Sequence, residues 1–200
     1  MASVIDRDAA VRLLAEGAVV AIPTDTVYGI AAALSHPSAV ATLFALKRRP
    51  TTVALPVLAA SLEQIARLGV TWPDDASRLS REFWPGALTI IVRVPHELAQ
   101  RVGSNSDAVG FRIPDDELLL GILNRSGPLA VSSANEHGEP PCESVAEVLN
   151  AFGGQDGLDG VVDDGERSGQ VSTVVDLSVT PWRLVREGAI GAGELRNVLN

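Results

Sequence analysis

The stretch Ala18-Val-Val-Ala-Ile22, followed at once by Pro23-Thr-Asp-Thr-Val-Tyr-Gly29, decides the fold class. The first five residues form a short apolar run rich in β-branched side chains, which is typical of a strand buried in a sheet. The next seven place Thr and Asp side chains directly after that strand, where α/β proteins bind their ligands. Residues 6–16 repeat apolar side chains at helical spacing and stop at Gly17, so a helix leads into the strand.

Helical and extended patterns continue to alternate along the chain. Further helices are predicted at 38–47, 61–68, 74–83, 115–124, 144–152 and 193–199, and further strands at 53–58, 88–94, 109–113, 129–132, 161–162, 173–177 and 183–185. This alternation predicts one α/β domain over residues 1–200, and hairpin-like spacing between 88 and 113 indicates a mixed sheet. Pro56 places its strand near an edge of the sheet. Residues 153–170 are rich in Gly and Asp and are expected to form a mobile loop.

Composition excludes several classes of protein. The chain has 200 residues, of which 46% are hydrophobic and 20% charged, as in globular domains. One cysteine excludes a disulfide framework and a Cys-rich zinc site, and three scattered histidines argue against a His-built metal centre. The net charge of -9 disfavours a general electrostatic affinity for nucleic acid. We therefore expect no metal centre built from Cys or His and no tight nucleic-acid binding.

Several familiar signals are missing. The sequence contains no G-x-x-x-x-G-K-[ST] loop, no G-x-G-x-x-G turn and no G-x-S-x-G elbow. An ATP site, if there is one, is therefore built without the common loops. The N-terminus lacks a secretory pattern, and the uncharged stretch 26–46 is broken by Gly, Ser, His and Pro, which makes it a poor membrane span. We expect a soluble, cytoplasmic protein.

Lys47 is the only lysine among sixteen Lys and Arg residues. It stands in Lys47-Arg48-Arg49-Pro50, at the end of a predicted helix, where the helix dipole favours any cation. The alternative is an anion site, in which lysine acts as a compact point charge and arginine as a planar fork on phosphate or carboxylate. The cluster by itself leaves both interpretations open.

Arg112 interrupts the apolar segment Gly110-Phe-Arg-Ile-Pro114. A buried arginine needs an anion, either a structural carboxylate or the carboxylate of a ligand. Small polar residues also border the predicted strands at 132–135 and 172–173, as they do in the 23–29 segment. Such residues either cap their own turns or offer hydroxyl and amide groups to a shared ligand.

These segments together resemble one family. In order along the chain they are P-T-D-T-V-Y-G at 23–29, K-x-R at 47–49, W-P-G-x-L-T at 84–89, R-x-P at 112–114, S-A-N at 133–135, S-T-V at 172–174 and R-x-G at 186–188. Their number and order resemble the YrdC-type threonylcarbamoyl-AMP synthases over about residues 5–190. The resemblance implies a twisted mixed α/β sheet flanked by helices around a large central cavity.

The resemblance also implies a reaction. L-threonine, bicarbonate and ATP would give threonylcarbamoyl-AMP and pyrophosphate, and a separate transferase complex would deliver the product to adenosine 37 of tRNA as N6-threonylcarbamoyladenosine. Magnesium would arrive on the triphosphate of ATP. By position in the motifs, threonine would be held by Thr26, Arg112, Ser133 and Ser172, and ATP by Lys47, Arg49, Asn135 and Arg186. The catalytic set would be Lys47, Arg49, Ser133 and Asn135.

The chain departs from the family pattern at Ala54, Glu136, His137 and Glu187. These changes bear on efficiency and on the choice of amino acid. Two alternative functions are compatible with the same motifs. One is a carbamoyl-adenylate-forming relative such as the YrdC-like domain of HypF, and the other is a non-catalytic RNA- or ribosome-binding module of the same fold. The net charge of -9 weighs against RNA binding.

Overall fold

Strands and helices alternate along the whole computed structural model, which describes residues 2–48, 53–136 and 139–200. The strands are β1 (Ser3–Ile5), β2 (Val19–Ile22), β3 (Gly29–Ala33), β4 (Val57–Leu58), β5 (Leu88–Arg93), β6 (Ala108–Arg112), β7 (Leu129–Ser133), β8 (Gly160–Val162), β9 (Thr173–Asp176) and β10 (Arg183–Arg186). The helices are α1 (Arg7–Ala15), α2 (Pro37–Leu46), α3 (Leu62–Arg67), α4 (Asp74–Phe83), α5 (His96–Arg101), α6 (Glu117–Ser126), α7 (Val145–Phe152) and α8 (Ala192–Leu199). The predicted α/β class is confirmed.

Side-chain caps fix where four of the helices begin. Asp6, Ser61, Asp116 and Ser144 each accept a hydrogen bond from the backbone N–H three residues further on, at the start of α1, α3, α6 and α7. Such a bond satisfies one of the N–H groups that the first helical turn leaves without a partner. The sequence encodes these helix starts locally, which is why the predicted and observed starts agree closely.

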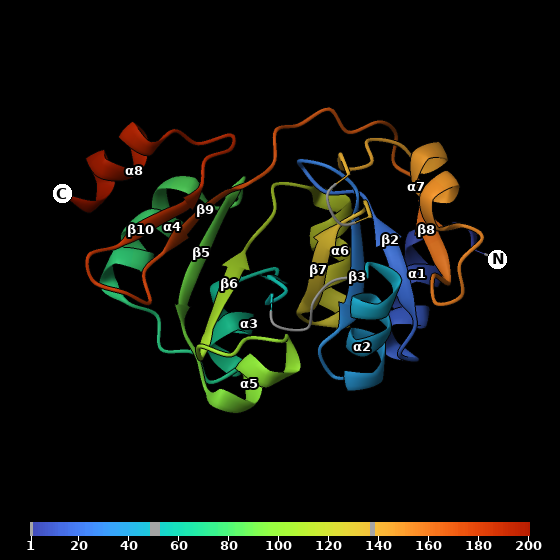
Figure 1. Ribbon diagram of the computed structural model, residues 1–200, viewed down its shortest axis with the longest axis horizontal. Helices are drawn as coiled ribbons and strands as arrows, with labels where there is room; N and C mark the ends of the chain where they lie inside the picture. Colours follow the sequence, from blue (N-terminus) through green and yellow to red (C-terminus); the bar gives the residue numbers. More distant parts are fainter. Residues whose placement is uncertain (1, 49–52, 137–138) are drawn as a thin grey trace.

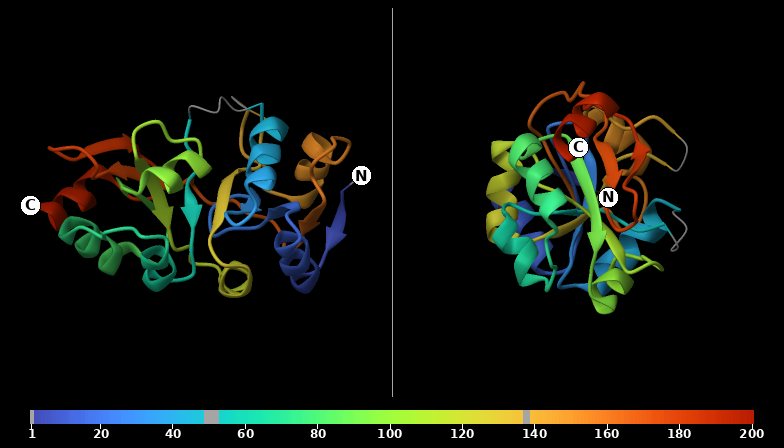
Figure 2. Two further views of the ribbon diagram at one scale, coloured as in Figure 1. Left: turned by 90° about the horizontal axis from the view of Figure 1, so that it is seen from below. Right: turned by 90° about the vertical axis from the view of Figure 1, so that its left-hand side faces the viewer.

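The strands pair into one mixed sheet in the order β1-β8-β2-β3-β7-β4-β6-β5-β9-β10. β5 and β6 are antiparallel, as their spacing predicted, whereas β5 and β9 are parallel. In the left view of Figure 2, α1, α6, α3 and α4 line one side of the sheet, and α2, α5 and α7 lie on the other. The helices on both faces bury the sheet, so its central strands carry almost no polar side chains except near their ends.

The sheet is narrowest at β4, which has only two residues and joins two larger halves. Figure 1 shows β5, β6, β9 and β10 in one half and β2, β3, β7 and β8 in the other. Because β4 is so short, the strands on either side of it extend beyond it without a neighbour between them. This opening in the middle of the sheet is where the polar motifs gather.

The prediction of an edge strand at 53–58 is wrong in both extent and position. The strand expected at 53–58 is only Val57–Leu58, and it lies inside the sheet between β6 and β7. Pro56 precedes that strand, so its missing N–H removes no ladder bond, while its carbonyl accepts from Val131 N. Sequence reasoning also missed β1 and β3. The sequence of β3, Gly-Ile-Ala-Ala-Ala, has little strand propensity, and its burial between β2 and β7 makes it a strand.

The region 153–170 is not one long loop. It contains β8, and residues 163–169 are hydrogen-bonded to three other parts of the chain, namely the 23–28 turn, Asp116 and Glu143. Within the described ranges, no helix is long and apolar enough to cross a membrane.

Candidate functional site

A cavity of about 400 Å³ opens between the two halves of the sheet. Its size is in the usual range for small-molecule sites. One half contributes Thr24, Thr26, Ser132 and Ser133 to its lining, and the other contributes Thr89, Arg112, Ser172 and Arg186. Five of the eight predicted site residues therefore line the cavity, namely Thr26, Arg112, Ser133, Ser172 and Arg186.

The sheet topology explains why motifs far apart in sequence meet here. The 23–28 turn leaves the end of β2, and Ser133 ends β7, which pairs with the start of β3. On the other side, Arg112 ends β6 and Ser172 immediately precedes β9. Through β4, whose Leu58 pairs with both Arg112 and Leu129, the ends of β6 and β7 point in opposite directions. The two groups therefore meet across the opening beside β4, where Arg112 donates to Thr26 and Asp25.

The turn after β2 is capped by Thr24. Its hydroxyl donates to the carbonyl of Val27 at 2.7 Å and accepts from the backbone N–H groups of Thr26 and Val27. This is the self-capping turn that the sequence suggested as an alternative to ligand binding. The turn cap leaves room for a ligand, because Thr24 supports the turn while Thr26 lines the cavity.

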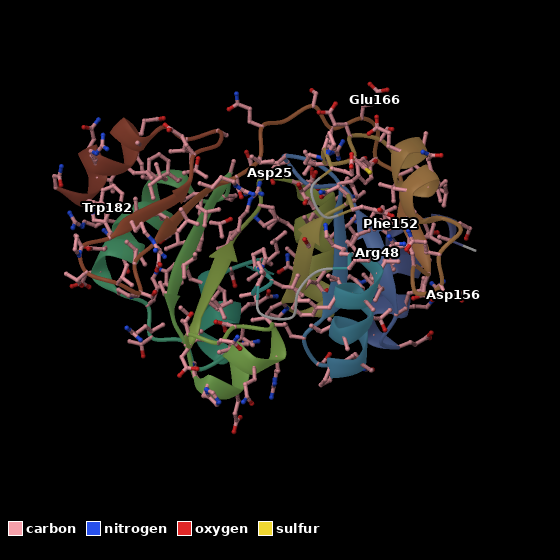
Figure 3. The ribbon with its side chains drawn as sticks, in the orientation of Figure 1. Asp25, Arg48, Phe152, Asp156, Glu166 and Trp182 are labelled. Atoms are coloured by element: carbon pink, nitrogen blue, oxygen red, sulfur yellow. The ribbon has the colours of Figure 1, made fainter. Side chains whose placement is uncertain are left out.

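Arg112 has a structural carboxylate partner. Its Nη2 donates to Asp25 Oδ1 at 2.5 Å, and the two side chains are only 6% and 12% exposed. Its Nε donates to the carbonyl of Gly86 at 2.9 Å, and its Nη1 to Thr26 Oγ1 at 3.2 Å. Figure 3 shows Asp25 at the junction of the two halves. The guanidinium is thus held on three sides while it lines the cavity, so the structural partner does not exclude a ligand.

Ser172 and Arg186 form the opposite wall. Arg186 donates to the Ser172 carbonyl from Nε at 3.0 Å and from Nη2 at 2.8 Å, and Nη2 also reaches Ser172 Oγ at 3.0 Å. Thr89 Oγ1 lies 3.0 Å from the same hydroxyl. Burial lowers the pKa of Arg186, and the nearby charge of Arg112 lowers it further. Two guanidinium groups that repel each other across a cavity favour an anionic ligand between them.

Lys47 is the C-cap of α2, which confirms its predicted position at a helix end, and its side chain is buried. Its ammonium group is directed to the end of β7, where Nζ donates to the Ser133 carbonyl and, at 3.3 Å, to Asn135 Oδ1. The same Oδ1 accepts from Ser133 Oγ at 2.5 Å. Lys47 and Asn135 therefore do not line the cavity themselves but hold Ser133, which does.

A buried thiol lies in the same region. Burial and the Glu147 carboxylate raise the pKa of Cys142 to about 11, while the charge of Lys47 lowers it. The thiol is therefore protonated at neutral pH and is a weak nucleophile.

Some predicted positions cannot be placed or lie elsewhere. Arg49 and His137 are outside the described residues. Glu187 turns away from the cavity and accepts from the N–H of Ala192 at the start of α8. Ala54 lines the cavity, whereas Glu136 Oε1 accepts a hydrogen bond from Gln155 Nε2 at 3.4 Å.

Sequence reasoning missed three supporting residues. Asp25 and Thr89 stand inside the quoted motifs, where a search for partners of Arg112 and Ser172 could have found them. Arg167 stands in the glycine-rich region expected to be mobile, and no sequence signal marks it. Across 2–48, 53–136 and 139–200, no three His, Cys, Asp or Glu side chains are grouped to hold a metal ion.

We predict that Asp25→Ala lowers the free energy of unfolding by about 3–5 kcal/mol, because it leaves the buried Arg112 charge without its carboxylate. Urea denaturation measures this loss. The matched control is Glu63→Ala, which removes the exposed partner of Arg67 and should change stability by less than about 1 kcal/mol. Equal small losses for both variants would show that the Asp25 pair contributes no more than a surface ion pair.

Comparison with known proteins agrees with this geometry. Residues 12–188 match the Sua5/YciO/YrdC family model, described as "Telomere recombination". A threonylcarbamoyl-AMP synthase of Pyrococcus abyssi is 35% identical over 192 residues, covering 95% of this chain and 56% of that protein. A Mycobacterium leprae relative is 38% identical over 95% of this chain and 86% of its own length.

A solved structure points the same way. The crystal structure of P. abyssi Sua5 complexed with L-threonine superposes with a TM-score of 0.90 at 33% identity. The match covers 99% of this chain and 60% of that one, so this chain spans little more than half the length of the archaeal protein. With its motifs gathered at one cavity and the family model matched over residues 12–188, the chain belongs to the Sua5/YciO/YrdC family.

Proposed function

We propose that this chain is an L-threonylcarbamoyladenylate synthase, which makes threonylcarbamoyl-AMP and pyrophosphate from L-threonine, bicarbonate and ATP. The observation that carries the proposal is the cavity in which Arg112 and Arg186 stand among the hydroxyls of Thr26, Ser133 and Ser172. Curated relatives with this name share 35–36% identity with the chain over 95% of its length.

The lining suits an amino acid that carries a carboxylate and a hydroxyl. The planar guanidinium of Arg112 can bind a carboxylate through its N–H groups on the cavity side. Hydroxyls of Thr26 and Ser172 lie within reach of the same guanidinium or of its neighbour Arg186. Apolar side chains of Val27, Leu58 and Val174 complete the lining and offer contact to a methyl group.

The chemistry needs no protein nucleophile. The amine of threonine and bicarbonate first condense to a carbamate, with loss of water. A carbamate oxygen then attacks the α-phosphorus of ATP, the bond from that phosphorus to the bridging oxygen breaks, and pyrophosphate leaves. The chain positions the two reactants and stabilises the charge on the phosphates. Arg186 supplies a cation at the cavity wall, Lys47 supplies one behind Ser133, and the K-x-R motif adds Arg49.

Other components follow from the same reaction. Magnesium enters on the triphosphate, since the described part of the cavity offers cations and hydroxyls and not the carboxylates that a protein-held magnesium needs. The product passes to a tRNA threonylcarbamoyl-transferase complex in the cytoplasm. The acidic chain, with a net charge of -9, leaves tight tRNA binding to that complex.

We predict that pyrophosphate release requires ATP, bicarbonate and L-threonine together, and that L-threonine is used better than L-serine. One methyl group in an apolar pocket is worth about 1–3 kcal/mol, or roughly 10- to 200-fold in kcat/KM. A coupled pyrophosphate assay with one component omitted at a time measures both effects.

The same assay distinguishes the proposed function from the alternative functions. Pyrophosphate release that depends on carbamoyl phosphate and not on threonine would identify a carbamoyl-adenylate enzyme. Release unaffected by removing bicarbonate would contradict the carbamate step, and equal rates with serine would contradict the methyl contact.

We predict that Lys47→Arg lowers kcat by about 10- to 1000-fold, as loss of one charge-stabilising donor does. Lys47 is 3% exposed, so a planar guanidinium has no room to reach the Ser133 carbonyl along the same path. The companion variant Lys47→Met keeps the length of the side chain and removes the charge. Turnover and melting temperature are measured on the same samples. Full activity of Lys47→Arg, or a loss that only follows unfolding, would contradict a role of Lys47 in catalysis and leave it a structural residue.

A further inference from the structure

Residues Asp163–Gly169, which we call the strap, cross from the half that contains β8 to the half that contains β9. Figure 1 shows this segment running along one end of the molecule above the opening between the halves. Three hydrogen bonds fasten the strap to the 23–28 turn, and two of them do not involve Arg167. Tyr28 Oη donates to the Gly165 carbonyl at 2.8 Å, and Gly169 N donates to the Thr26 carbonyl at 3.0 Å.

Arg167 is the centre of these contacts. Its Nε donates to the Thr24 carbonyl at 2.9 Å, and its Nη2 pairs with Asp116 at 3.2 Å and with Asp164 at 2.6 Å. The backbone N–H of Arg167 also donates to the Glu143 carbonyl at 2.7 Å. The Arg167 and Asp116 side chains are 16% and 10% exposed, so the pair lies largely inside the molecule. By contrast, Glu166 points away from the body of the molecule (Figure 3).

The partners of Arg167 belong to the site on both sides of the cavity. Thr24 caps the turn that carries Thr26, and Asp116 caps α6 only four residues after Arg112. Burial by itself would lower the pKa of Arg167, but the bond to Asp164 and the charge of Asp116 outweigh burial and raise it. The guanidinium is thus a paired cation that links Thr24 of the 23–28 turn to Asp116, which follows β6.

The strap also determines where Ser172 lies. Gly169 packs so closely on the 23–28 turn that an added Cβ would lie 2.8 Å from the Thr26 carbonyl oxygen and 3.0 Å from that of Asp25. Ser172 follows only three residues later and lines the cavity. A strap that moves off the turn therefore shifts Thr26 and Ser172 relative to each other.

We propose that Arg167 is a positioning residue for the amino-acid substrate, which sets the spacing of Thr26 and Ser172 by clamping the strap onto the 23–28 turn. This inference rests on the proposed function, because it assigns Arg167 to the threonine side of that site. Arg167 does not line the cavity, so it acts through these two residues and not by contact with the substrate.

The test compares two variants that loosen the strap by different physical means. Arg167→Ala removes the clamp, and Gly169→Ala keeps Arg167 but inserts a methyl group between strap and turn. Both should raise the KM for L-threonine at least about tenfold while the KM for ATP stays within about twofold, because small displacements of positioning groups are costly. Arg167→Lys keeps the charge but loses the planar guanidinium that binds two partners at once. Its KM for L-threonine should therefore lie between those of wild type and Arg167→Ala.

Two controls are matched to these changes. Gly154→Ala alters an exposed glycine of the same 153–170 region that has nothing within 4 Å of the added methyl group, and Arg125→Ala removes an exposed arginine whose partner is Asp8. Neither should change either KM. Melting temperatures of all variants show whether they are folded under the assay conditions.

The outcomes separate this inference from the proposed function. If wild type releases no pyrophosphate with threonine and bicarbonate, the proposed function fails. If wild type is active but both variants keep the wild-type KM for threonine, the inference is overturned. A parallel rise in the KM for threonine and for ATP would also overturn it, because it would show a general structural role.

Discussion

The ion pair between Asp25 and Arg112 is the contact on which the arrangement of the site depends. The two residues are 87 positions apart in the chain, and β3, β7 and β4 lie between their strands in the sheet. They meet only because β4 is two residues long and the turn after β2 reaches across the opening that it leaves. Buried charges are costly unless they are paired and hydrogen-bonded, so this contact strongly favours one relative placement of the two halves.

A buried pair of this kind also controls the charge of the cavity. Asp25 balances the charge of Arg112, whereas the Ser172 carbonyl and hydroxyl that bind Arg186 are uncharged. Burial and the nearby charge of Arg112 both lower the pKa of Arg186. The cavity therefore keeps a net positive character inside a protein whose net charge is -9. Such local charge favours a carboxylate or phosphate within the cavity without attracting nucleic acid to the whole surface.

The sequence predicted those parts of the structure that depend on neighbouring residues. Ser61 and Asp116 cap their helices locally, and β5 and β6 follow from hairpin spacing. β3 could not be predicted in this way, because a run of alanines becomes a strand only between two buried neighbours. The motifs correctly placed Thr26, Arg112 and Ser172 at one cavity. They could not show that Asp25 pairs with Arg112, where the Lys47 ammonium is directed or what Arg167 contacts, because these features depend on contacts between distant segments.

A crystal structure of this chain with bound L-threonine tests the central claim most directly. We predict that the threonine carboxylate lies within hydrogen-bond distance of Arg112 between Thr26 and Ser172, while Asp25 remains paired with the same guanidinium. Threonine bound away from Arg112, or bound with Asp25 displaced from it, would contradict the claim that the protein's own carboxylate fixes the arginine for its substrate.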